Sequence, residues 1–121
     1  MTKVAVLGSG SWGTALAFIL ADRGDQVFLW GRREATSKTI LEAKENPQYL
    51  PGVILPQNIL PTSNLKTAVV SADLIVLAVP SQAVRGLCQQ IKALVSDRAI
   101  ITNAAKGLET DTLLTLSNVI N

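Results

Sequence analysis

VAVLGSGSWG, residues 4–13, is the stretch that decides the fold of this 121-residue chain. The apolar run before the glycines predicts a strand, and the segment 14–23, apolar on nearly every face, predicts a helix packed against a sheet. In such a strand–turn–helix unit, Gly8 allows the tight turn, Gly10 lets the backbone approach a pyrophosphate, and Gly13 permits close packing of helix on strand. The helix N-terminus then presents unpaired N–H groups to the phosphates. We therefore predict a dinucleotide site, the alternative being a glycine turn without a ligand.

The rest of the chain alternates strand and helix patterns. The strand candidates are rich in β-branched and aliphatic residues and are continuously apolar, as in strands covered on both faces. The most regular helix candidate carries apolar residues at three- and four-residue spacings. Such alternation is typical of βαβ units, so we predict an α/β fold with a Rossmann-like doubly wound parallel sheet in one domain. The expected strands are 4–7, 26–30, 74–79 and 99–102, and the expected helices are 14–23, 34–44 and 81–95.

One segment, residues 46–61, interrupts this alternation with four prolines and Gly52. Proline fixes φ, removes a backbone donor and favours extended geometry in the residue before it. We therefore expect a structured loop with one short strand around Ile59. Its apolar residues, Tyr49 among them, predict that the loop is packed and functional.

The end of the second expected strand bears on the choice of cofactor. An NAD site normally places Asp or Glu at this position, on the ribose 2′-hydroxyl. The chain has Trp30-Gly31-Arg32-Arg33 instead, with no carboxylate at the tip. Arginine makes forked, charge-assisted hydrogen bonds to phosphate, so the pair favours the 2′-phosphate of NADP(H). Glu34 lies close enough for NAD(H) to be used as well, and the alternative is that both arginines are solvated charges at a helix start.

Two further turns follow expected strands, where doubly wound sheets bind ligands. Ser81 is expected to cap the helix that begins there. Lys106, in the turn 103–107, is placed to reach a phosphate or a carbonyl oxygen, the alternative being a surface lysine. Cys88 lies on the apolar stripe of its helix and is expected in the core rather than as a reactive thiol. Trp12 covers the cofactor or anchors the turn, and its spacing does not decide between the two.

The composition excludes several classes of protein. The chain has no histidine and one cysteine, so imidazole chemistry, an internal disulfide and a structural zinc site are excluded. A net charge of +2 gives no reason to expect nucleic acid or an anionic membrane surface as partner. With 48% hydrophobic and 17% charged residues the chain is expected to fold. It has no apolar run of the roughly 18 residues that span a bilayer, and we expect a soluble cytoplasmic protein.

Taken in order, the motifs resemble those of the bacterial-type NAD(P)-dependent glycerol-3-phosphate dehydrogenases, and the resemblance covers essentially the whole chain. It implies reversible reduction of dihydroxyacetone phosphate to sn-glycerol 3-phosphate, the entry to glycerophospholipid synthesis, by an enzyme expected to be a homodimer. The matching motifs are Gly8-Ser-Gly-Ser-Trp-Gly-Thr-Ala15, Trp30-Gly-Arg32, Asn46-Pro-Gln-Tyr-Leu-Pro51, Leu55-Pro-Gln-Asn-Ile59, Ala78-Val-Pro-Ser81 with Arg85, and Lys106-Gly-Leu-Glu109.

The resemblance also assigns site residues. It places Ser11, Trp12, Arg32, Arg33 and Tyr49 along the NADPH site, beside the three glycines. Lys106 would contact both cofactor and substrate. The proton-transfer lysine of the family lies downstream, in a C-terminal helical domain that this chain lacks. We therefore expect an incomplete nucleotide-binding domain over residues 1–121, ending before the last strands of the sheet, with no catalytic residue and no activity of its own.

Two other functions remain open. Another Rossmann reductase, such as a ketopantoate reductase, shares the early glycine loop, but the Tyr49-Leu-Pro and Lys106-Gly-Leu-Glu motifs count against it. From a different class, a non-catalytic nucleotide-sensing module suits the chain's length. NADPH binding without turnover, in a protein whose gene ends at Asn121, would support the sensor.

Overall fold

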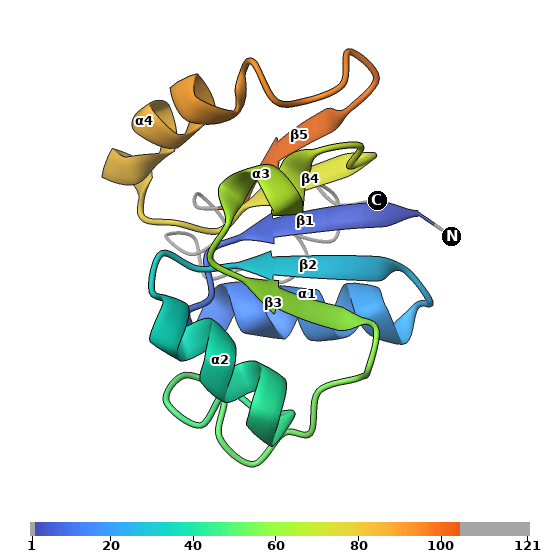
Figure 1. Cartoon of the computed structure of the whole chain (residues 1–121), viewed down its shortest axis with the longest axis vertical. Coiled ribbons are helices and arrows are strands. Elements are labelled where there is room, and N and C mark those ends of the chain that lie inside the picture. The colour runs from blue at the N-terminus through green and yellow to red at the C-terminus, as the bar shows by residue number, and fades with distance from the viewer. Residues whose placement is uncertain (1, 105–121) are drawn as a thin grey trace.

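The structure, a computed structural model, describes residues 2–104 and contains a five-stranded parallel sheet in the order β3-β2-β1-β4-β5. Figure 1 shows the arrowheads of the strands pointing toward one edge, with the N-terminus at the other. This confirms the prediction of a Rossmann-like α/β sheet. The strands are β1 (Lys3–Leu7), β2 (Gln26–Trp30), β3 (Ile59–Thr62), β4 (Leu74–Leu77) and β5 (Ile100–Asn103).

The register of the parallel pairing aligns the carboxyl ends of the central strands with one another. Leu7, the last residue of β1, pairs with Trp30 on one side and with Leu77 on the other. Leu77 pairs in turn with Asn103 at the end of β5. The loops after β1, β2, β4 and β5 therefore all leave from one edge of the sheet.

Helices cover both faces of the central strands. Successive residues of β1 point to opposite faces. Val4 and Val6 pack with the apolar side of α1, while Ala5 and Leu7 pack with residues of α3 and α4. The helices are α1 (Ser11–Asp22), α2 (Glu34–Ala43), α3 (Leu65–Val69) and α4 (Ser81–Ile91).

Several element boundaries differ from the sequence-based expectation by one to four residues, most of all the end of α4, which lies at Ile91 rather than residue 95. α1 begins at Ser11 rather than residue 14, so the glycine motif runs into the first helical turn. β4 ends at Leu77 rather than residue 79, although the N–H of Ala78 still donates to Leu7 O at 2.9 Å. The predicted cap at Ser81 is wrong, since Pro80 holds the N-cap position and Ser81 is the first helical residue.

The short helix α3 was not predicted. Its start has a recognisable cap, because Asn64 Oδ1 accepts a hydrogen bond from Thr67 N at 3.0 Å. The sequence Asn64-Leu-Lys-Thr contains that signal, but five helical residues give too short a run for periodicity to reveal.

Lys3 lies at the amino-terminal edge of the sheet, opposite the edge from which the loops described above leave. Its Nζ donates to Thr67 O at 3.2 Å and to Val70 O, and it lies 4.4 Å from the centroid of the Phe28 ring. Burial against these groups lowers the pKa of the Lys3 ammonium. The residue ties β1 to the end of α3 and has no part in the site.

β5 lies at an exposed edge of the described sheet, as expected for a sheet that ends before its last strands. Within residues 2–104 it pairs only with β4, and the side chains of Ile100 and Ile101 are 64% and 45% exposed. A strand at the edge of a sheet offers unpaired backbone groups, and apolar side chains beside them favour association with another chain.

We therefore expect the isolated 121-residue chain to self-associate. Sedimentation velocity should show species larger than the monomer, and Ile100→Lys with Ile101→Lys should shift the distribution toward monomer, because charge on an edge strand opposes pairing. A monodisperse wild-type monomer would contradict the expectation.

Candidate functional site

The turn after β1 requires glycine at its first position. Gly8 has φ +129°, and its N–H donates to Trp30 O at 2.8 Å, which draws the turn against the end of β2. A Cβ on Gly8 would lie 2.5 Å from Ala78 O. Both the backbone conformation and the neighbouring chain therefore exclude a larger residue.

Two further glycines allow close backbone packing. A Cβ on Gly13 would overlap the carbonyl oxygen of Gly8 and lie 2.8 Å from its carbon, so α1 packs directly on the turn. A Cβ on Gly31 would overlap the hydroxyl of Ser9 and lie 2.9 Å from its Cβ. The sequence motif predicted the need for Gly13 but not for Gly31, whose partner comes from a different loop.

Gly10 has the opposite environment. Nothing lies within 4 Å of a Cβ built on it, and it occupies the N-cap of α1 without a side-chain cap. The first helical hydrogen bond runs from Thr14 N to Gly10 O at 3.0 Å, so the N–H groups before Thr14 have no partner in the helix. Open space and free donors at a helix N-terminus are what a phosphate requires.

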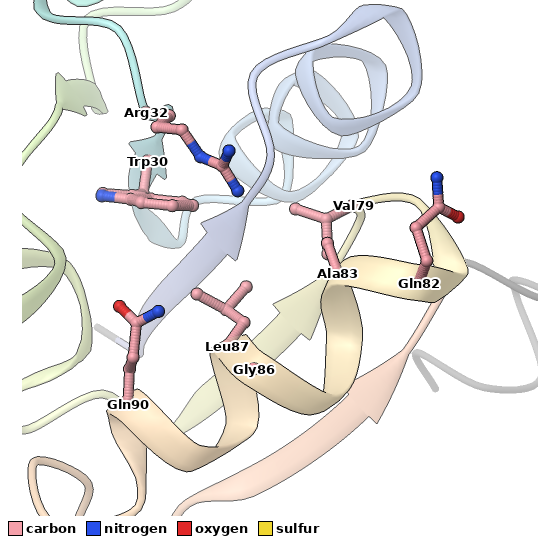
Figure 2. Close-up of a pocket in the computed structure, with 8 residues that line it drawn as sticks. All are labelled: Trp30, Arg32, Val79, Gln82, Ala83, Gly86, Leu87 and Gln90. Atoms are coloured by element: carbon pink, nitrogen blue, oxygen red, sulfur yellow. The ribbon is translucent and has the colours of Figure 1, made fainter.

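A continuous groove runs from this turn across the carboxyl edge of the sheet. One section, about 340 Å³, lies between the glycine turn and the start of α2. Two others, about 490 and 320 Å³, extend toward α4, and all three share Arg32 and Val79. Figure 2 shows Trp30 and Arg32 on one side of the α4 section, facing Leu87 and Gln90 on the other.

Five of the predicted site residues meet in the first section of the groove. They are Gly8, Gly10, Arg32, Arg33 and Tyr49. The tyrosine comes from the proline-rich loop, which confirms that this loop is structured, and its side chain is 37% exposed.

Arg32 and Arg33 supply the positive charge of the groove. Both side chains are exposed, and in the part of the chain described neither makes a hydrogen bond or an ion pair. Arg33 occupies the N-cap of α2 with φ −94°, and Glu34 begins the helix. Both guanidinium groups are thus available to bind an anion in the groove. Glu34, which carries a carboxylate, is the next residue in the sequence.

The other predicted residues lie elsewhere. Ser11 is exposed on the first turn of α1, and Trp12 packs against the hydrophobic core on the α1 face of the sheet. Trp12 Nε1 is buried with no partner among residues 2–104. This packing favours the role of anchor for the turn, while contact with a cofactor stays a prediction for both residues. Lys106 lies outside the described residues.

The structure adds one residue to which the sequence had assigned no role. Asn46 is 1% exposed, and its Nδ2 donates to Ser9 O and to Thr14 Oγ1, both at 2.9 Å. Thr14 is also fully buried and donates from Oγ1 to the same Ser9 O at 3.3 Å. The signal for Asn46 was weak, because a lone asparagine before a proline predicts a turn rather than a buried contact across 37 residues.

The sheet order, the glycine turn at a helix N-terminus and the charged groove define a Rossmann-like dinucleotide-binding domain. Comparison with known proteins identifies the family to which this domain belongs. Residues 3–121 match the family model described as NAD-dependent glycerol-3-phosphate dehydrogenase N-terminus, and the chain belongs to that family.

Individual relatives agree with this assignment. Glycerol-3-phosphate dehydrogenase [NAD(P)+] of Bacillus licheniformis is 45% identical over 120 residues, 99% of this chain and 35% of its own length. The corresponding protein of Moorella thermoacetica is 48% identical over 118 residues, 98% of this chain and 35% of its own length. The crystal structure of glycerol-3-phosphate dehydrogenase from Coxiella burnetii superposes with a TM-score of 0.78 at 32% identity, over 83% of this chain and 31% of that one.

The chain thus spans about a third of the length of the relatives it matches. The shared part is the N-terminal NAD(P)-binding part. Among residues 2–104, no helix has the length and apolar character needed to cross a membrane.

Proposed function

We propose that this chain is the cofactor-binding part of an sn-glycerol-3-phosphate dehydrogenase that prefers NADP(H) over NAD(H). The enzyme would reversibly reduce dihydroxyacetone phosphate to sn-glycerol 3-phosphate for glycerophospholipid synthesis, in the cytoplasm and as a homodimer. One observation carries the cofactor proposal: Gly10, which has open space beside it, lines the same groove as the side chains of Arg32 and Arg33, which are unpaired within the described part of the chain. Family membership supports the reaction.

The residues of the groove suit the parts of a dinucleotide. The donors around Gly10 and the first turn of α1 would hold the pyrophosphate. Arg32 and Arg33 would bind the 2′-phosphate with charge-assisted hydrogen bonds. The largely apolar wall of Val79, Ala83 and Leu87 would accept the flat base.

Bound NADPH would supply a hydride to the substrate ketone. The chain's own contribution would be to bind and orient that cofactor and, through Lys106, to contact the phosphate or carbonyl oxygen of the substrate. Proton transfer belongs to a lysine in the further domain that the family resemblance implies. The 121-residue chain alone is therefore expected to bind NADPH without turning over substrate.

A nucleotide-sensing module remains the second candidate, because a groove that only binds a dinucleotide would suffice for that function. The discriminating experiment joins this chain to a segment supplying the other two thirds of the relatives' length. Reduction of dihydroxyacetone phosphate, followed by loss of NADPH absorbance, supports the dehydrogenase. Tight NADPH binding with no turnover in that longer protein favours the sensor.

The cofactor preference is tested by Arg32→Ala with Arg33→Ala. We expect NADPH binding to weaken at least several-fold while NADH binding is nearly unchanged, since only NADPH carries the 2′-phosphate. The double variant Lys38→Ala with Lys92→Ala removes the same charge from exposed positions away from the groove. Calorimetric titration of both double variants distinguishes direct contacts of the arginines from the general effect of removing two positive charges. Equal loss for both cofactors would mean that the arginines hold something else.

A further inference from the structure

We infer that Asn46 is the positioning residue of the nucleotide site, because it sets the direction in which the Ser9–Gly10 peptide faces. The inference rests on the proposed binding of a dinucleotide in the groove. Asn46 does not line the section of the groove beside the glycine turn, although it lines a neighbouring pocket together with Arg33 and Thr36. It acts on the turn through its hydrogen bond to the backbone of Ser9.

The argument starts from the geometry of one peptide unit. A trans peptide is planar, and its C=O and N–H point in opposite directions. Ser9 O receives hydrogen bonds from Asn46 Nδ2 at 2.9 Å and from Thr14 Oγ1 at 3.3 Å, both on the buried side of the turn. The N–H of Gly10, in the same peptide plane, must then point away from this buried side, and the space beside the Gly10 Cα is open.

The buried side of this turn is a closed network. Asn46 Nδ2 also donates to Thr14 Oγ1 at 2.9 Å, so the three groups are mutually bonded with Asn46 and Thr14 removed from water. Glycine has little preference of its own between two peptide orientations. Without the amide of Asn46, the Ser9–Gly10 peptide loses the shorter of the two hydrogen bonds that select one orientation, and an outward-facing carbonyl would repel a phosphate.

Asn46 also connects the glycine turn to the loop that carries Tyr49. Asn46 O accepts from Leu50 N at 2.8 Å, in the same loop that brings Tyr49 to the groove. One buried side chain therefore joins the phosphate turn to the loop on the far side of the groove. Binding of the pyrophosphate is expected to depend on Asn46 even though Asn46 does not touch it.

The test is Asn46→Asp, which keeps the size of the side chain and replaces the Nδ2 donor by an oxygen that repels Ser9 O. We expect NADPH binding to fall at least tenfold in calorimetric titrations of the full chain. Binding of adenosine 2′-monophosphate, which has the base and the 2′-phosphate but no pyrophosphate, should change less than twofold. A merely structural role would weaken both ligands together.

Asn58→Asp is the matched control. Asn58 Nδ2 also donates to two backbone carbonyls, Ala21 O and Asp25 O at 2.7 Å each, but at the C-terminal end of α1 away from the groove. It should lower the melting temperature and leave both affinities intact. If Asn46→Asp does not fold, Thr14→Val removes one hydroxyl of the same network, and we expect a twofold to fivefold loss for NADPH alone.

The possible outcomes distinguish a failure of the inference about Asn46 from a failure of the proposed function. Wild-type protein that fails to bind NADPH contradicts the proposed function. Wild-type binding combined with unchanged NADPH affinity in the folded Asn46→Asp or Thr14→Val variants overturns the role of Asn46. Equal losses for NADPH and adenosine 2′-monophosphate overturn it as well.

Discussion

Gly13→Ala is expected to lower the free energy of unfolding by about 3 kcal/mol, the upper range for overpacking against a neighbour that cannot move freely. The added Cβ would overlap the Gly8 carbonyl oxygen, which belongs to the backbone of a turn held by Trp30 O. Alanine has a higher helix propensity than glycine by about 1 kcal/mol, so two effects oppose each other. The clash decides the sign, because relieving it means moving α1 away from β1.

Chemical denaturation measures this change, and Gly86→Ala is its control. Gly86 also lies within a helix, α4, but nothing is within 4 Å of a Cβ built on it. There the propensity acts alone, and we expect a stabilisation of about 0.5–1 kcal/mol. Stabilisation by both substitutions would show that Gly13 is not closely packed.

Lys106→Ala is the second large effect that we expect. In a protein carrying this chain together with the other two thirds of the relatives' length, kcat/KM should fall by a factor equivalent to roughly 2–4 kcal/mol of transition-state stabilisation. The chain stays bound to the sheet edge as far as Ala104, whose N–H donates to Leu77 O at 2.9 Å. Lys106 follows two residues later in the sequence.

The kinetic test needs two comparisons. Lys106→Arg should restore little activity, since a broad planar guanidinium does not replace a compact ammonium. Lys92→Ala, at the exposed end of α4, removes a positive charge away from the groove and should leave kcat/KM unchanged. Near-normal kinetics for Lys106→Ala would mean a solvated lysine and would limit the site to the groove itself.

Much of the fold was predictable because its signals are local. The run Val4 to Leu7 and the three glycines after it specify strand, turn and helix through the conformations that these residues allow. The β2 strand was predicted with the observed bounds, Gln26–Trp30. The exposed edge at β5 was expected from the resemblance to a longer family and not from the strand's own residues, because apolar residues indicate a strand but not how many neighbours the strand has. Ile100 looks the same in sequence whether another element packs on it or not.

The sequence by itself determined that the chain is a Rossmann-like nucleotide-binding unit, and it determined which arginines and glycines to test. Only the tertiary structure showed that Asn46 reaches Ser9 across 37 residues and that Gly31 must admit the side chain of Ser9. Both contacts bring the loop after β1 to a loop from elsewhere in the chain, the first after α2 and the second after β2. Their residues acquire a function only once parallel pairing aligns Leu7, Trp30 and Leu77 at one edge. A local pattern cannot encode such a distance, because the sheet register that sets it is decided by packing of the whole domain.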